Sequence, residues 1–151
     1  MRIVCVIPSR YESSRFPGKP LADLCGKPML QHVYERVLRA KTVTEAAVAT
    51  DDRRIFEAVE KFGGRAIMTA ERHRSGTDRI AEAAMALNLE DTDIVVNIQG
   101  DQPIFEPTQI DEVVEPLLAD PSIPMSTLIY RIVREEEISH PNAVKTVFDK
   151  E

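Results

Sequence analysis

Short apolar runs alternate with amphipathic stretches along most of the chain. The apolar runs have the length of buried strands and lie at 3–7, 46–49, 65–69 and 93–98. Between and after them, apolar residues recur three and four positions apart, which predicts helices over 28–41, 53–62, 73–87 and 107–119. This alternation predicts an α/β fold, with a mostly parallel sheet covered by helices on both faces in the Rossmann-like manner.

The last part of the chain has a different pattern. Residues 125–133 alternate between apolar and polar, and residues 142–149 form another short apolar stretch, so we expect two further strands there. A strand that ends in turn residues predicts a partner strand, and none follows within the 151 residues. The chain is therefore expected to be a truncated form of a larger fold.

Length and composition fit one globular domain, with 43% hydrophobic and 29% charged residues. A net charge of −6 argues against a nucleic-acid partner, which normally meets a basic face. The sequence has neither an apolar run of about 20 residues nor a signal-peptide pattern, so we expect no membrane partner and a cytoplasmic location. Cys5 and Cys25 match no metal or redox spacing and are expected to be structural.

A cationic loop follows the first predicted strand. It carries Arg10, Arg15 and Lys19, and Pro17 and Gly18 shape its end. Strands of open α/β sheets that lead into such loops commonly hold phosphates. The spacing is not that of a P-loop, which has a glycine five residues before its Gly-Lys pair and a Ser or Thr after the lysine. A solvated basic loop remains the alternative.

An acidic group follows the fourth predicted strand. Asp101 lies on a glycine turn, and its oxygen is the ligand type that Mg²⁺ takes beside substrate phosphates. A plain turn residue is the alternative. Right-handed crossovers place all strand-to-helix loops at one edge of the sheet, so the loops at 9–19, 50–52 and 99–103 are expected to converge on one cleft.

Two helix starts carry residues with competing interpretations. Ser75, Gly76 and Thr77 offer small side chains and backbone N–H groups that bind anions or base edges, but Ser75 or Thr77 also fits a helix cap. Asp51 and Asp52 lie where a strand gives way to a helix, and Asp52 fits a cap there.

Three residue strings are more specific than these general patterns. They are I-P-S-R-x-x-S-S-R-F-P-G-K-P-L at 7–21, H-x-S-G-T-D-R at 73–79 and Q-G-D-x-P at 99–103. Together they resemble the sugar-activating cytidylyltransferases, and among them those that act on 3-deoxy-manno-octulosonate (Kdo). The resemblance extends over essentially the whole chain and implies the nucleotide-diphospho-sugar transferase fold.

The resemblance also implies a reaction, in which Kdo and CTP give CMP-Kdo and pyrophosphate for lipopolysaccharide biosynthesis. It implies CTP contacts from Pro8, Ser9, Arg10, Arg15, Lys19, Arg74, Ser75, Gly76 and Gln99. Arg10, Lys19 and Asp101 are the expected catalytic residues, with Mg²⁺ as cofactor on Asp101. Asp51 is expected beside the nucleotide.

Members of this family continue well beyond the length of this chain. Residues 1–151 are therefore expected to be the nucleotide-binding, N-terminal part of a single-domain enzyme, without the acceptor and dimerisation part. We expect this part alone to be inactive and the full-length enzyme to be a homodimer. The alternatives are a synthetase for CMP-sialic acid or another CMP-activated acid sugar, an enzyme that activates a sugar phosphate with another nucleotide, and a non-catalytic nucleotide-binding module.

Overall fold

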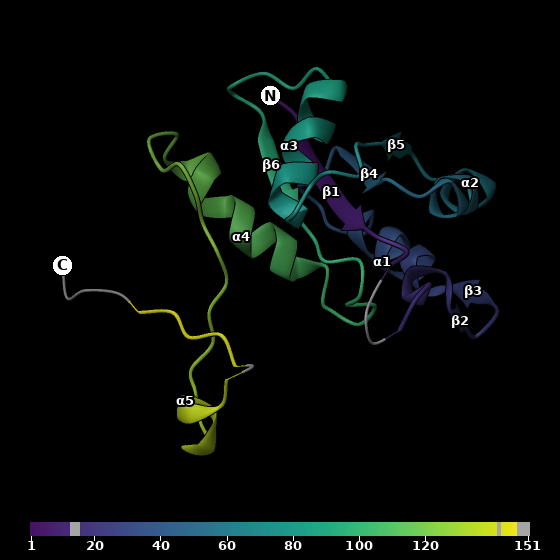
Figure 1. Cartoon of the computed structure of the whole chain (residues 1–151). Coiled ribbons are helices and arrows are strands. Elements are labelled where there is room, and N and C mark those ends of the chain that lie inside the picture. Colours follow the sequence, from purple (N-terminus) through teal and green to yellow (C-terminus); the bar gives the residue numbers. More distant parts are fainter. Residues whose placement is uncertain (13–15, 142, 148–151) are drawn as a thin grey trace.

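The computed structural model describes residues 1–12, 16–141 and 143–147 (Figure 1). Its main elements alternate as the hydrophobic pattern predicts. The strands and helices of this core are β1 (Ile3–Ser9), α1 (Met29–Val37), β4 (Glu45–Thr50), α2 (Arg53–Lys61), β5 (Ala66–Met68), α3 (Gly76–Ala86), β6 (Ile94–Asn97) and α4 (Thr108–Ala119). The smaller elements are the 3₁₀ helix η1 (Lys19–Leu21), the strands β2 (Asp23–Leu24) and β3 (Lys27–Pro28), and the short helix α5 (Glu136–Ser139).

The core of the molecule is a four-stranded parallel sheet with the strand order β5-β4-β1-β6. Ser9 of β1 pairs in register with Thr50 of β4, and Thr50 pairs with Met68 of β5. Three strands therefore end at the same level, and their following loops leave from one edge of the sheet. The predicted mostly parallel α/β sheet is confirmed.

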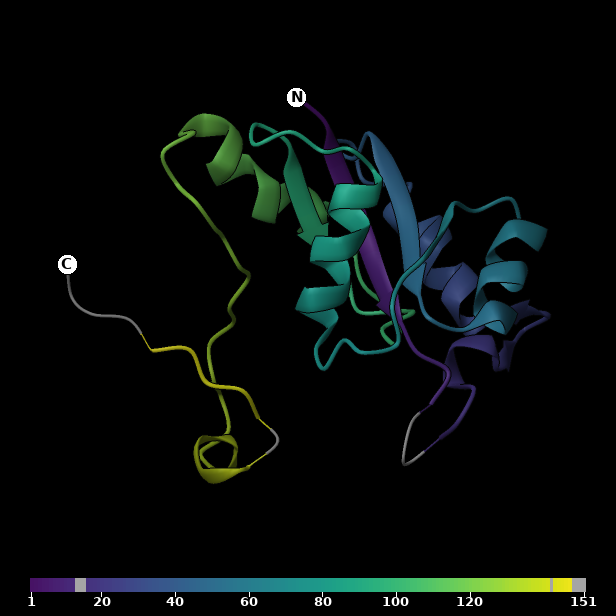
Figure 2. The same cartoon turned by 45° about the horizontal axis from the view of Figure 1, so that its top comes forward.

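Helices cover both faces of this sheet, as the pattern predicts. One layer contains α1, α2 and α4, whose buried side chains pack with Cys5 and Ile7 of β1. The opposite layer contains α3, whose Ile80 and Ala83 pack with Val4 and Val6. Alternate β1 side chains thus enter opposite cores, and Figure 2 shows α3 in front of the sheet with α1 behind it.

The two strands expected after residue 124 are not present in the structure. Residues 125–133 have no regular structure and most are exposed, and the described part of 142–149, residues 143–147, is likewise without a strand. Tyr130 and Val144 are 84% and 95% exposed. The chain after α4 leads away from the sheet in both views (Figures 1 and 2). An alternating segment becomes a strand only by pairing with a neighbour, and here it lies beside none.

Some helix boundaries also differ from the prediction. α1 ends at Val37 rather than near residue 41, and Leu38, which follows it, is 54% exposed. α3 begins at Gly76 rather than at residue 73, and its buried residues are Arg79, Ile80 and Ala83. Among the described residues, no helix is long and apolar enough to cross a membrane.

Candidate functional site

The strand order reverses between β1 and β6. From β1 the chain adds β4 and then β5 on one side, and it returns to place β6 on the other side of β1. At such a switch point the loops after the two central strands diverge and leave a crevice at the carboxyl edge of the sheet. The switch point here lies between the loop after Ser9 and the loop after Asn97, and we expect a ligand to bind there.

A hydrogen bond joins the two ends of the loop after β1. The Gly18 amide donates to the Tyr11 carbonyl at 2.7 Å, and the Arg54 guanidinium lies 3.2 Å from the centre of the Tyr11 ring. Gly18 has a φ of +73°, which glycine adopts without strain. A Cβ there would lie 3.0 Å from the Tyr11 ring. These contacts fix the point at which Lys19 enters η1.

Lys19 and Asp101 meet at the switch point. Lys19 Nζ lies 2.9 Å from Asp101 Oδ2, although 82 positions separate the two residues in the sequence. The side chains are 38% and 55% exposed, so a ligand in solution can reach both. The predicted convergence of these two loops is confirmed.

Backbone segments lie close together at the end of β1. A Cβ on Gly76 would lie 3.3 Å from Pro8 Cγ, and a Cβ on Gly100 would lie 3.3 Å from the Pro8 carbonyl oxygen. The start of α3 and the turn after β6 therefore both contact the end of β1. Segments from three distant parts of the sequence, predicted to form one site, are neighbours here.

Ser9 and Arg10 stand at the end of β1. Ser9 is 4% exposed, and its hydroxyl oxygen has no hydrogen-bond partner among the described residues. A buried polar atom in this position commonly has a water or ligand partner. Arg10 is exposed, and its Nη2 donates to the carbonyl oxygen of His73. Arg10 thus connects the loop after β1 to the segment before α3.

The remaining predicted CTP contacts have different surroundings. Ser75 caps α3, since its Oγ accepts from the Asp78 amide at 3.1 Å and the Ser75 amide donates back to the Asp78 carboxylate. The capping interpretation of Ser75 is therefore correct. Arg74 is exposed, and the Gln99 amide donates to Asn97 Oδ1 at 3.2 Å. Arg15 lies outside the described residues.

Asp51 and Asp52 have different partners: Asp52 caps a helix and Asp51 forms an ion pair. Asp52 caps α2, with its Oδ1 accepting from the Arg54 amide at 2.9 Å, and the Arg54 side chain holds the pKa of Asp52 below its ordinary value. Asp51 forms an ion pair with the fully buried Arg79, at 2.5 Å between Oδ2 and Nη2. Arg79 also donates to Thr69 at 2.5 Å. This pair was not predicted, although a charged residue beside Ile80 on an apolar helix face was its signal in the sequence.

Metal binding would depend on Asp101. Among the residues that the structure describes, no group of three or more His, Cys, Asp or Glu side chains could hold a metal ion. Mg²⁺ does not need such a cage, because it keeps several waters and uses one or two carboxylates together with substrate phosphates. The accessible Asp101 carboxylate, placed beside a cationic side chain that a phosphate would attract, fits that type of site.

Comparison with known proteins gives consistent results. A family model described as "Cytidylyltransferase" matches residues 4–151. The 3-deoxy-manno-octulosonate cytidylyltransferase of Syntrophus aciditrophicus is 78% identical over 149 residues, which are 99% of this chain and 60% of the relative. The same-named protein of Desulfatibacillum aliphaticivorans is 57% identical, over 100% of this chain and 62% of the relative. The chain thus spans about three fifths of these curated relatives.

A similar solved structure is that of a CMP:2-keto-3-deoxy-manno-octonic acid synthetase complexed with CTP. It is 49% identical to this chain, with a TM-score of 0.77 over 82% of this chain and 50% of the other. The similarity therefore extends from the sequence to the arrangement of the sheet and its helices.

Proposed function

Because this chain belongs to the cytidylyltransferase family, we propose that it binds CTP at the switch point and serves the transfer of CMP to Kdo. The observation that carries the proposal is the contact between Lys19 and Asp101 at the switch point, at 2.9 Å. Both side chains are accessible. A bound triphosphate would attract Lys19, and its Mg²⁺ would attract Asp101, so the two side chains would part when CTP binds. The names of the similar proteins favour Kdo over other acid sugars as the acceptor.

In this reaction the anomeric hydroxyl of Kdo attacks the α-phosphorus of CTP. A new bond forms between the hydroxyl oxygen and the α-phosphorus, and the hydroxyl proton passes to solvent. The bond between the α-phosphorus and the oxygen that bridges to the β-phosphorus breaks, and pyrophosphate leaves with that oxygen. Lys19 and Arg10 would hold the phosphates by charge and so stabilise the charge that develops on the departing group. Mg²⁺, held by Asp101 and the phosphates, would supply further charge neutralisation.

The start of α3 would receive the nucleoside. Ser75 is occupied by its cap, so the groups that remain for the base and ribose are backbone atoms around Gly76 and the nearby Gln99 and Arg74 side chains. Ser9, whose hydroxyl has no hydrogen-bond partner among the residues described, would add a polar group at the end of β1. A full-length enzyme of this kind would work as a cytoplasmic homodimer in lipopolysaccharide biosynthesis.

Calorimetric titration of the chain tests the proposal. CTP is expected to bind in the presence of Mg²⁺, and UTP and ATP are expected to bind at least about tenfold more weakly, because one lost hydrogen bond to a base edge costs about 1–3 kcal/mol. Equal affinity for the three nucleotides would contradict a cytidylyl-specific site. The absence of binding by CTP would contradict the proposal as a whole.

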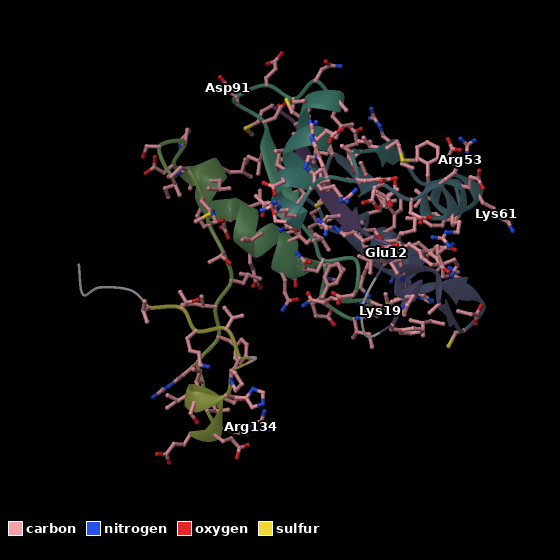
Figure 3. The ribbon with its side chains drawn as sticks, viewed as in Figure 1. Glu12, Lys19, Arg53, Lys61, Asp91 and Arg134 are labelled. Carbon is pink, nitrogen blue, oxygen red and sulfur yellow. The ribbon has the colours of Figure 1, made fainter. Side chains whose placement is uncertain are left out.

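Lys19→Ala is expected to weaken CTP binding by about tenfold or more, because a hydrogen bond between charged partners contributes about 1.5–3 kcal/mol. Lys61→Ala is the matched control, since Lys61 is an exposed lysine at the far end of α2 (Figure 3). Its removal should leave the affinity unchanged. Equal affinities of the two variants would exclude Lys19 from the site.

A further inference from the structure

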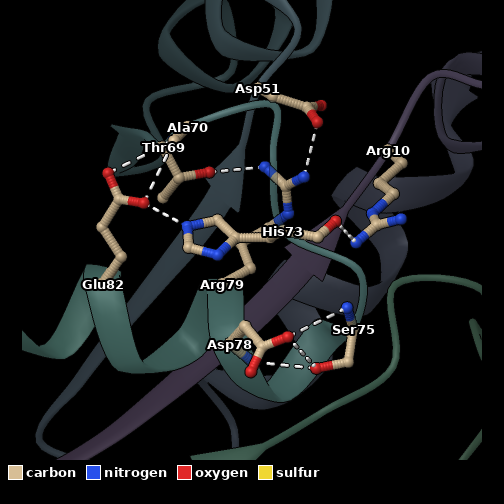
Figure 4. A network of polar contacts seen from close by, with 9 residues as sticks. All are labelled: Arg10, Asp51, Thr69, Ala70, His73, Ser75, Asp78, Arg79 and Glu82. Atoms are coloured by element: carbon tan, nitrogen blue, oxygen red, sulfur yellow. Dashed lines mark hydrogen bonds and ion pairs between the residues drawn. The ribbon is translucent and has the colours of Figure 1, made fainter.

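Side chains of helix α3 form hydrogen bonds with the loop that precedes the helix. This loop, residues 69–75, connects β5 to α3 and reaches the candidate site at its end (Figure 4). Arg79 donates to Thr69 at 2.5 Å near the start of the loop, and Asp78 completes the cap with Ser75 at its end. Glu82 contacts Ala70 and His73, which lie between these two points of the loop.

Glu82 makes two contacts to this loop. Its carboxylate oxygens accept from the Ala70 amide at 3.2 and 3.1 Å, and Oε2 also pairs with the His73 ring nitrogen Nε2. The side chains of His73 and Glu82 are 13% and 32% exposed, so water screens the pair only partly. The His73 contact, followed by that from Ala70, holds the pKa of Glu82 below its ordinary value.

His73 connects this contact to the loop after β1. Its side chain is bound to Glu82, while its carbonyl oxygen accepts from Arg10. Figure 4 shows the two bonds extending from opposite sides of His73, one to α3 and one to the end of β1. A change in the placement of His73 therefore moves the acceptor that orients Arg10.

We propose that Glu82 is a positioning residue for the nucleotide site, acting through Ala70 and His73 to hold the His73 carbonyl where it orients Arg10. This inference rests on the proposed function, because the role of Arg10 in holding phosphate is part of it. Glu82 lies on α3 and contacts the loop at 69–75, so its effect on the nucleotide would be indirect. Its side chain contributes order to a segment that backbone contacts alone would leave less fixed.

The test compares three variants of the chain with the unaltered protein. Glu82→Ala removes both contacts, Glu82→Gln keeps a carbonyl acceptor for the Ala70 amide and can still bind the His73 ring, and Glu57→Ala removes an exposed helical glutamate whose partner is Arg53. CTP affinity in the presence of Mg²⁺ is measured by calorimetry. Hydrogen exchange of the amides at 70–75 is measured without nucleotide, and circular dichroism verifies that each variant is folded.

Glu82→Ala is expected to weaken CTP binding about tenfold and to speed exchange at 70–75 about tenfold, as the loss of one charged hydrogen-bond acceptor implies. Glu82→Gln is expected to restore most of both properties, and Glu57→Ala to change neither. Faster exchange with unchanged CTP affinity would overturn the inference, because the loop would then be held for stability alone. An equal loss in the Ala and Gln variants would overturn it too.

Failure of the proposed function gives a different result. The unaltered chain would then bind no CTP, and the role of Glu82 in nucleotide binding would fail with it. If the unaltered chain binds CTP and Glu82→Ala binds it equally well, only the inference about Glu82 fails.

Discussion

Replacing Asp101 by asparagine is expected to remove the Mg²⁺-dependent part of CTP binding. With Mg²⁺ present, we expect the affinity to fall by about 10- to 100-fold, because a neutral amide is a poor ligand for a hard cation that the protein holds by one carboxylate. Without Mg²⁺ the affinity should stay the same or rise slightly, because Lys19 then loses the carboxylate that competes with the phosphates. Titration with CTP at several Mg²⁺ concentrations measures both effects.

The opposite signs of these two effects make the prediction specific. Asp91→Asn is the control, since Asp91 is an exposed carboxylate in the loop before β6, away from Lys19 (Figure 3). That variant changes the net charge equally, so it corrects for the long-range repulsion of the nucleotide. An Asp101→Asn protein that keeps the full response to Mg²⁺ would show that the metal is held elsewhere.

The sequence predicted the core of the fold because its signals are local. The period of the apolar residues indicated four buried strands and four helices, and the strand–helix alternation indicated the parallel sheet. The parallel topology then predicted that Lys19 and Asp101 meet, since loops at the carboxyl edge converge whatever their sequence. The strand expected over 125–133 was wrong because pairing is a non-local property that the pattern alone does not supply.

The surroundings of individual site residues were less predictable. The string around Ser75 fitted both a cap and a ligand contact, and only the contact with Asp78 shows that the hydroxyl serves the cap. The pairing of the Asp51 carboxylate with Arg79 was not predicted. That partner comes from a helix 28 positions later, and a spacing in the sequence does not reveal which charges are buried together.

Arg79→Leu is expected to lower the free energy of unfolding by about 3 kcal/mol, because breaking a buried ion pair leaves the other charge without its partner. Arg79 is fully buried and donates to both Asp51 and Thr69, whereas the Asp51 side chain retains 18% exposure, which places the cost at the lower end of the usual range. Urea unfolding measures the effect. Arg53→Leu is the control, since Arg53 is 85% exposed in its pair with Glu57 and should cost less than about 0.5 kcal/mol.

A double variant separates the charge from the packing. Arg79→Leu combined with Asp51→Asn removes both charges, so we expect it to recover about 1–2 kcal/mol of the loss that Arg79→Leu causes alone. Recovery of that size would show that the main cost is the unpaired carboxylate of Asp51. Additive effects of the two changes would contradict this account. They would assign the stability to the packing of Arg79 and to its bond to Thr69.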